Sequence, residues 1–201
     1  TFQYRASKVP MTDHAANPNT IVLIIGGGVA GIKAAMDLSE ARKDVLLIDQ
    51  APTIGGLMTQ LDRTFPTNNC DLCTISPRLS AGARQRHIEL MPLTRLTRLE
   101  GDAGNFSVTL ASSPRHIDPE KCTACGKCHK EFPACVRFDP GLDHRAPTCM
   151  RYPQATPQAF SIDMAACTDV DALVKACPAN AIVIDDTEKQ TTRQVGAVIL
   201  A

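Results

Sequence analysis

Thr20-Ile-Val-Leu-Ile-Ile25 runs directly into Gly26-Gly-Gly-Val-Ala-Gly31, and this junction decides the fold. The first part is a β-branched and aliphatic run, which predicts a buried strand. The second part has the pattern G-x-G-x-x-G. Ile32–Ala41 then predicts a helix with one apolar face, and Val45–Asp49 predicts a second strand that ends in an acid. A strand, a glycine turn, a helix and a strand in this order predict a βαβ unit and a Rossmann-like α/β fold.

The glycine turn has the chemistry of a dinucleotide site. Glycines permit a tight turn and a close approach of the backbone to a pyrophosphate, and a helix N-terminus offers N–H groups and a positive dipole end. The acid about twenty residues further on accepts hydrogen bonds from ribose hydroxyls and disfavours a 2′-phosphate, so FAD or NAD is favoured over NADP. The alternative is a glycine turn that only packs helix on sheet. The candidate residues are Gly26, Gly28, Gly31 and Asp49.

A second motif predicts a metal centre. Cys122, Cys125 and Cys128 form the pattern C-x2-C-x2-C, and Cys177-Pro178 follows about fifty residues later, as in bacterial ferredoxins. Proline after the fourth cysteine removes a backbone N–H and fixes φ. The spacing predicts one [4Fe–4S] cluster. The alternative is zinc, since C-x2-C pairs also form zinc ribbons, but the third cysteine and the Cys-Pro pair favour iron.

Composition limits the classes of function. The formal net charge is zero, so there is no electrostatic case for nucleic acid or an anionic membrane. Apolar runs have strand length only, and the first twenty residues lack the apolar core of a secretory signal. With nine cysteines and no signal, metal or redox chemistry is favoured over a disulfide framework. No Ser–His–Asp set or paired carboxylate site is visible, which argues against hydrolysis.

The composition and residue patterns divide the chain into four segments. Residues 1–19 predict a flexible N-terminal arm, and residues 20–116 carry the βαβ unit. Residues 117–186 contain seven of the nine cysteines and predict an insert that depends on metal for folding. Residues 187–201 predict a return strand, with the buried-strand pattern over Gln194–Ala201.

Shorter elements are expected within the second segment. Pro52–Gly56 predicts a loop, and His87–Met91 and Phe106–Leu110 predict short strands on either side of Gly101–Gly104.

Several stretches together resemble the flavin-binding A subunit of heterodisulfide reductases: Ile24–Ala35, Ile54–Thr67, Asn69–Pro77, Asp118–Cys128, Tyr152–Pro157 and Val195–Ala201. The resemblance implies an FAD-binding domain of the thioredoxin-reductase type, interrupted by an inserted ferredoxin-like iron–sulfur domain. It also implies electron transfer within a complex with other iron–sulfur subunits. By resemblance, Gly55, Gly56 and Arg63 approach the flavin, with Arg63 near its N1–C2 edge; the alternative for Arg63 is a surface charge.

The insert departs from the family pattern of two clusters. Six residues separate Cys128 from Cys135, where three are usual, and the second run lacks its middle cysteines. Cys135 and Cys167 match family ligands of the second cluster, and Cys149 replaces one lost ligand. The missing ligand comes from Cys70, Cys73, His129 or His144, or else these cysteines are buried, inert thiols. This altered insert resembles the heterodisulfide-reductase-like subunit of bacterial cytoplasmic sulfur oxidation, which implies a cytoplasmic protein.

Cys70 and Cys73 form a further C-x2-C pair. The pair ligates a cluster, forms a redox-active dithiol as in thioredoxin reductase, or packs as ordinary thiols. Cluster ligation is favoured, because the chain is already rich in cluster ligands.

The end of the sequence bears on the flavin site. In flavoproteins of the type implied by the resemblance, a strand such as Val195–Ala201 leads into a Thr-Gly turn, and a further stretch completes the FAD fold. The sequence ends at Ala201, so we expect either a fragment or another segment that finishes the site. A separate NAD domain is not expected in these residues.

The predicted function is electron transfer between FAD and iron–sulfur clusters, with the insert passing electrons to a partner subunit. We expect partners among other iron–sulfur subunits, with homo-oligomers also open. The alternatives are a relay or scaffold subunit without flavin turnover, and a zinc-binding module on a Rossmann-like domain.

Overall fold

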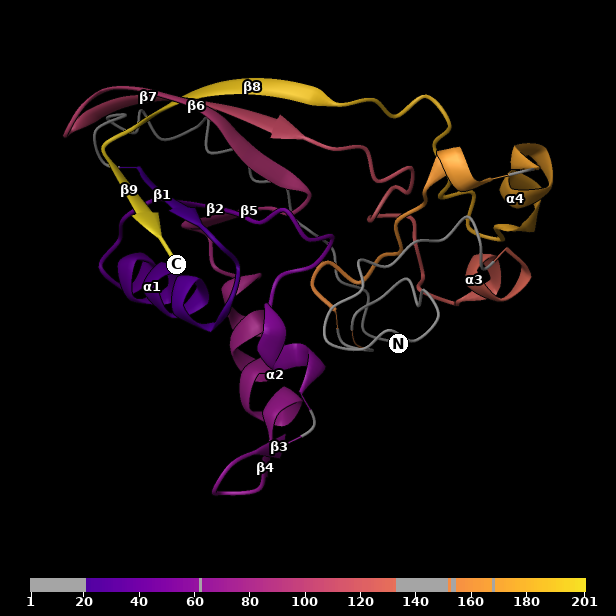
Figure 1. Ribbon diagram of the computed structural model, residues 1–201, viewed down its shortest axis with the longest axis horizontal. Coiled ribbons are helices and arrows are strands. Elements are labelled where there is room, and N and C mark those ends of the chain that lie inside the picture. Colours follow the sequence, from indigo (N-terminus) through magenta and orange to yellow (C-terminus); the bar gives the residue numbers. More distant parts are fainter. Residues whose placement is uncertain (1–20, 62, 133–151, 153–154, 168) are drawn as a thin grey trace.

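The computed structural model describes residues 21–61, 63–132, 152, 155–167 and 169–201. The predicted arm and three of the candidate ligands lie outside the described residues: Cys135, His144 and Cys149. Figure 1 shows a lobe built around a sheet and a second lobe that carries the short helices α3 and α4, with strand β8 reaching back from the second lobe to the first.

A parallel sheet forms the centre of the first lobe. Its strand order is β5-β2-β1-β9, and each neighbouring pair is parallel. The strands are β1 (Val22–Ile25), β2 (Val45–Ile48), β5 (Ile88–Met91) and β9 (Ala197–Leu200). Helix α1 (Val29–Glu40) connects β1 to β2. The βαβ unit and the α/β fold predicted from the sequence are confirmed.

Both faces of this sheet are covered, which explains its continuous apolar strands. On one face, Ile24 and Leu47 pack with Ile32 of α1 and with Leu79. On the other face, side chains of the sheet pack against an antiparallel sheet; this group is Leu23, Leu46, Ile48, Val108, Leu110 and Val195. The core therefore has two halves, and each half fixes the register of β1 and β2.

The antiparallel sheet has the order β6-β7-β8. Strands β6 (Thr94–Asp102) and β7 (Asn105–Ser112) form a hairpin, so the strand predicted over Phe106–Leu110 is confirmed within β7. The sequence pattern at Gln194–Ala201 predicted one strand, and this was wrong. It divides at Gly196, because β8 (Lys189–Val195) pairs with β7 whereas β9 pairs with β1.

The chain leaves the antiparallel sheet after β7, forms the second lobe and returns to the sheet as β8. It contains α3 (Lys127–Glu131), the 3₁₀ turn η3 (Met164–Ala166) and α4 (Val170–Ala176), with a bridge between Ile117 and Ile182. Its small core is Ile117, Cys128, Ala159, Phe160, Ile162, Leu173 and Ala181. This connection supports the predicted division of the chain near residues 117 and 187, which stays a prediction.

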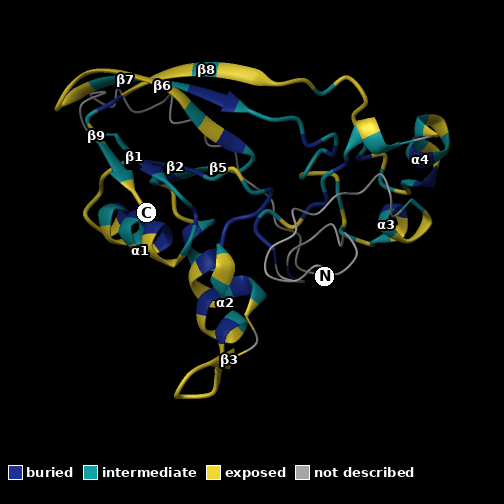
Figure 2. Cartoon of the chain, viewed as in Figure 1, coloured by how far each residue is buried: buried dark blue, intermediate teal, exposed yellow. Residues whose placement is uncertain are grey.

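Helix α2 (Asp71–Gly82) was not predicted from the sequence. The 3₁₀ turn η2 (Leu57–Gln60) and the short hairpin of β3 (Arg63–Thr64) and β4 (Asn69–Cys70) precede it. Figure 1 shows that α2 and this hairpin project away from the sheet, and Figure 2 shows that the hairpin is exposed. Among the described residues, no helix is both long and apolar enough to cross a membrane.

Candidate functional site

The glycine turn lies at the carboxyl end of β1, between β9 and α1. Gly26 has φ of +113°, and a Cβ on it would come 2.2 Å from the carbonyl oxygen of Ala201. A Cβ on Gly31 would come 1.9 Å from the carbonyl oxygen of Gly26. A Cβ on Gly28, by contrast, would meet nothing within 4 Å. Gly26 and Gly31 are therefore required by backbone packing, whereas Gly28 borders open space at the N-terminus of α1, where a ligand can approach.

Asp49 lies beside this turn. Its Oδ2 accepts a hydrogen bond of 2.7 Å from the backbone N–H of Gly27, and its Oδ1 accepts one of 2.7 Å from the N–H of Ala51. A carboxylate offers about four acceptor positions, so positions for further donors remain. Asp49 therefore both holds the glycine turn and retains the capacity to accept hydrogen bonds from a ribose.

Gly55 and Gly56 lie against the same turn. The N–H of Gly55 donates to the carbonyl oxygen of Gly27 at 2.7 Å, and a Cβ on Gly56 would stand 3.0 Å from the Cα of Gly28. The structure therefore brings these predicted residues to Gly28. Arg63 instead lies in the exposed strand β3, which is labelled in Figure 1, and pairs with Cys70 at the base of the hairpin. Its Nη1 is 3.5 Å from the carbonyl oxygen of Asn68. Its role at the flavin stays a prediction.

Tyr152, which belongs to the cysteine-rich segment 117–186, is inserted into the sheet lobe. Its buried hydroxyl donates to the carbonyl oxygen of Ile54 at 2.8 Å and accepts from the N–H of Thr156 at 3.3 Å. The N–H of Ile54 donates to the carbonyl oxygen of Thr156 at 2.9 Å. These bonds hold the loop that ends in Gly55. Tyr152 belongs to one of the stretches that carry the family resemblance, but no role was predicted for it from the sequence.

The second candidate site is a cavity among cysteines, which we call the cysteine cavity. It has about 340 Å³ of space free of atoms, part of it open to solvent, and it is lined by Ile117, Cys122, Thr123, Cys125, Gly126, Cys128, Phe160, Cys177, Pro178, Ala179, Ala181 and Ile182. Ala124 and Gly126 have positive φ, which lets the loop turn between successive cysteines. The structure therefore brings together the four predicted ligands of the first cluster: Cys122, Cys125, Cys128 and Cys177.

The electrostatics of the cysteine cavity reflect this crowding. Burial is the main cause that raises the pKa of the Cys128 thiol to about 11, and the neighbouring Cys122, Cys125 and Cys177 contribute to the increase. The Sγ of Cys177 accepts a hydrogen bond of 3.4 Å from the N–H of Ala181. Within the described ranges, no group of three or more His, Cys, Asp or Glu side chains converges as a single metal ion requires. Cys122, Cys125, Cys128 and Cys177 nevertheless line the same cavity, and four thiols are the ligand set of a [4Fe–4S] cluster.

The other described candidates divide between the two lobes. Cys167 packs against the core of the second lobe. On α3, the buried Nδ1 of His129 has no hydrogen-bond partner among the described residues. Cys70 and Cys73 are exposed at the start of α2, where the Sγ of Cys70 accepts from the N–H of Cys73 at 3.2 Å. A side-chain hydrogen bond between the two thiols, rather than this backbone bond, is the main cause that raises the pKa of Cys73. Figure 1 separates α2 from α3 and α4.

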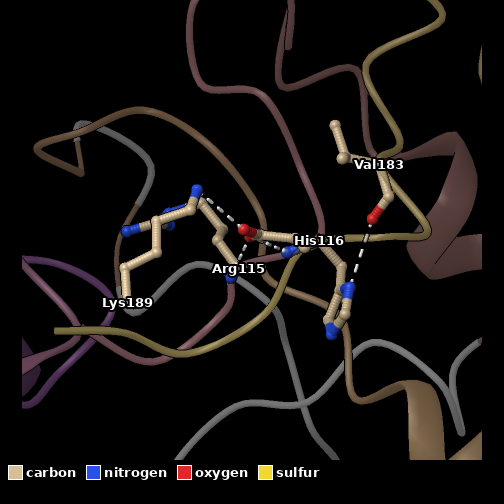
Figure 3. Close-up of polar contacts among 5 residues, drawn as sticks. Arg115, His116, Val183 and Lys189 are labelled. Carbon is tan, nitrogen blue, oxygen red and sulfur yellow. Dashed lines mark hydrogen bonds and ion pairs between the residues drawn. The ribbon is translucent and has the colours of Figure 1, made fainter. Parts of the chain in front are cut away.

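Asp186, which precedes β8, forms hydrogen bonds to the segment that follows β7. Its Oδ2 accepts from the backbone N–H groups of Arg115 at 2.9 Å and His116 at 3.2 Å, and its Oδ1 accepts from Nζ of Lys189 at 3.2 Å. The Nδ1 of His116 lies 3.1 Å from the carbonyl oxygen of Val183 (Figure 3). Asp186 was not predicted from the sequence, because no local pattern around it signals this contact.

Known proteins match the parts of the chain that contain the two candidate sites. Residues 24–90 match a family described as an NAD(P)-binding Rossmann-like domain. The second of the A-type iron–sulfur subunits of CoB–CoM heterodisulfide reductase in Methanopyrus kandleri is 38% identical over 196 residues, which cover 96% of this chain and 29% of that protein. The chain is homologous to the A subunits of heterodisulfide reductases. The corresponding A-type iron–sulfur subunit of Methanocaldococcus jannaschii is 39% identical over 181 residues, covering 89% of this chain and 28% of that protein.

Homology to the heterodisulfide reductase A subunits extends over the glycine turn and the cysteine cavity, since the first alignment includes 96% of the chain. The chain spans less than a third of the length of these curated relatives. Among solved structures, the L-proline dehydrogenase from P. horikoshii has a TM-score of 0.41 and 24% identity, covering 46% of this chain and 19% of that one.

Proposed function

We propose that this chain is the FAD- and [4Fe–4S]-binding electron-transfer part of a heterodisulfide reductase-like complex, and so an oxidoreductase. The observation that carries the proposal is the gathering of four cysteines around one cavity, in a chain whose sheet lobe ends in a glycine turn beside an acid. The printed names of the homologous proteins, which are iron–sulfur subunits of reductases, support it.

The glycine turn is the proposed FAD site. Gly28 leaves the backbone open to a pyrophosphate, and the first turn of α1 supplies N–H groups toward its negative charge. Asp49 accepts hydrogen bonds from the ribose, while its bonds to Gly27 and Ala51 keep the carboxylate in place. When bound, FAD supplies two-electron chemistry that can be divided into single-electron steps. Gly55 and Gly56 fix the loop that faces Gly28.

The cysteine cavity is the proposed site of the first [4Fe–4S] cluster, with Cys122, Cys125, Cys128 and Cys177 as ligands. When bound, the cluster supplies one-electron transfer. The apolar side chains of Ile117 and Phe160 limit access of water. The N–H of Ala181, donating to Cys177 Sγ, stabilises negative charge on that sulfur, and such bonds tune the potential of a cluster.

The proposal includes a second cluster, for which the chain offers more candidate ligands than one cluster needs. Its candidate ligands are Cys135, Cys149 and Cys167, with Cys70, Cys73, His129 or His144 completing the set. Cys167 and His129 lie in the lobe of the cysteine cavity, which favours His129 over the α2 pair as the completing ligand.

The partners we propose are other iron–sulfur subunits of a heterodisulfide reductase-like complex, acting in sulfur or thiol–disulfide metabolism. The altered cysteine spacing after Cys128 favours the branch of the family that serves bacterial sulfur oxidation. In such a complex, the second lobe is the part of this chain that passes electrons to a partner.

The deciding experiment quantifies iron, acid-labile sulfide and FAD per chain in anaerobically purified full-length protein, together with zinc. About eight irons and one FAD support two clusters beside a flavin, and about four irons support the first cluster alone. Iron without FAD favours a relay subunit without flavin turnover. Equimolar zinc with negligible iron favours the zinc-binding alternative and contradicts the proposal.

Replacing one ligand tests the assignment of the cluster. Cys128→Ser should lower the iron content by about four atoms per chain, because a cubane cluster rarely persists without a buried thiolate ligand. Cys73→Ser, which changes an exposed thiol on α2, is the matched comparison and should leave this cluster in place. If wild type and Cys128→Ser contain equal amounts of iron, the assignment of the first cluster to the cysteine cavity is wrong.

A further inference from the structure

Arg115 is a buried cation that lies between the two lobes. Only 7% of its surface is exposed. Its Nη1 donates to the carbonyl oxygens of Ala159 at 3.3 Å and Phe160 at 3.4 Å, and its Nη2 donates to the carbonyl oxygen of Pro52. Pro52 begins the loop that ends in Gly56 at the glycine turn, whereas Phe160 lines the cysteine cavity. One side chain therefore contacts a loop of each candidate site.

The charge of Arg115 is held mainly by carbonyl oxygens. Among the described residues, no carboxylate forms an ion pair with its guanidinium, and Asp186 contacts the backbone N–H of Arg115 instead. Burial lowers the pKa of Arg115 to about 10, while the charges of Cys122 and Asp186 oppose this, so the side chain is protonated at neutral pH. A buried cation without a directly paired anion acts strongly on nearby charges.

The lysines around the cysteine motif differ from Arg115 in their exposure to water and in their pairing with carboxylates. The side chain of Lys127 is 51% exposed and lies 3.9 Å from the carboxylate of Glu131, and that of Lys121 is 62% exposed and lies 3.6 Å from Asp118. Water and these carboxylates screen their charges. Of these three cations, Arg115 is the least exposed, and its field is therefore the least screened.

We propose that Arg115 is a positioning residue whose buried charge raises the reduction potential of the cluster at Cys122, Cys125, Cys128 and Cys177. The same side chain ties the lobe of that cluster to the loop beside the glycine turn. This proposal rests on the function proposed above. A cluster bound by four thiolates is negatively charged, and it gains one further negative charge when it accepts one electron. A nearby buried cation stabilises the reduced form more than the oxidised form.

The test measures the midpoint potential of this cluster in the full-length, anaerobically purified protein. Dithionite supplies the electron, and the reduced cluster is followed by electron paramagnetic resonance, using the signal that Cys128→Ser removes. Arg115→Gln keeps an N–H donor but removes the charge, whereas Arg115→Lys keeps the charge. Lys127→Gln removes an exposed charge next to a ligand and is the matched control.

We expect Arg115→Gln to lower the equilibrium constant for one-electron reduction about tenfold, which is about 59 mV for a one-electron couple. Arg115→Lys should stay within about threefold of wild type and Lys127→Gln within about twofold. An unchanged potential in Arg115→Gln, or equal shifts in the Gln and Lys variants, overturns the proposal while leaving the proposed function intact.

Loss of iron is also decisive. If the Gln variant loses the cluster and the Lys variant keeps it at the wild-type potential, the buried charge acts on the cluster, which supports the proposal. If both variants lose it, the shape of the guanidinium matters rather than its charge, and the proposal fails. Wild-type protein without iron overturns both this proposal and the proposed function.

Discussion

The two lobes reach their candidate sites by different physical means. In the sheet lobe, parallel strands with apolar side chains on both faces form a large core, and the glycine turn is fixed by direct backbone packing. The second lobe has a small core, and its cysteines are held by tight turns and a few hydrogen bonds. The first site is therefore determined by close backbone packing on a large core, whereas the second depends on turns and hydrogen bonds with little core behind them.

The largest loss of stability is expected from a substitution that disrupts the packing of the glycine turn. Gly31→Ala places a Cβ 1.9 Å from the carbonyl oxygen of Gly26, and backbone cannot move aside as a side chain can. We expect the free energy of unfolding to fall by about 3 kcal/mol or more. The measurement is urea unfolding followed by circular dichroism.

Gly28→Ala is the matched control within the same turn, because its Cβ meets nothing within 4 Å. It should lower the free energy of unfolding by less than about 1 kcal/mol, the range for alanine at a helix N-cap. Its affinity for FAD should fall, since the added methyl occupies the space proposed for the pyrophosphate. Similar stability losses in both variants would show that sterics do not distinguish the two glycines.

The sheet lobe was largely predictable from the sequence, because its signals are local. The run before Gly26, the spacing of the glycines and the acid at Asp49 lie within one βαβ unit, and each is found where the pattern predicts. Helix α2 was missed, since Pro77 and the polar residues around Cys70 are typical of a loop. The break at Gly196 was missed because Val195, the last residue of the otherwise polar β8, precedes the apolar β9 with only Gly196 between them, so the end of one strand and the whole of the next have the pattern of one apolar run.

Of the cysteine cavity, only the four cysteines that line it were predictable. The C-x2-C-x2-C spacing and Cys177-Pro178 named the four cysteines that the structure brings together. The contacts between the lobes were not predictable. Arg115, Tyr152 and Asp186 each act through residues more than sixty positions away in the chain, and no periodicity reports such pairs.

A smaller effect tests how firmly the second lobe is anchored to the sheet lobe. Tyr152→Phe removes the hydroxyl that bonds the carbonyl oxygen of Ile54 and the N–H of Thr156, and leaves both groups buried without this partner. The free energy of unfolding should fall by about 2 kcal/mol. Thr97→Val removes an exposed hydroxyl bonded to the carbonyl oxygen of Thr109 and should cost less than about 0.5 kcal/mol. Equal costs would mean that Tyr152 does not anchor the loop.

The smallest effect concerns pH at the junction of the lobes. Burial alone would raise the pKa of Asp186, but hydrogen bonds from the N–H groups of Arg115 and His116 and from Lys189 outweigh it, so the pKa is lowered. A carboxyl group with a lower pKa in the folded state binds fewer protons there than in the unfolded chain. Its contribution to stability is complete above the unfolded pKa, about 3.9, and is lost as pH falls through the folded pKa.

Asp186→Asn should therefore flatten the loss of stability on acidification below about pH 5, as measured by urea midpoints between about pH 3 and pH 6. The difference from wild type should be modest, because 18% of the side chain is exposed and water shares its hydrogen bonds. Asp185→Asn, which changes the exposed neighbour, should leave the pH dependence as in wild type. If the two variants behave alike, the link between β7 and β8 does not depend on the charge of Asp186, and the second lobe is held to the sheet by Tyr152 and Arg115 instead.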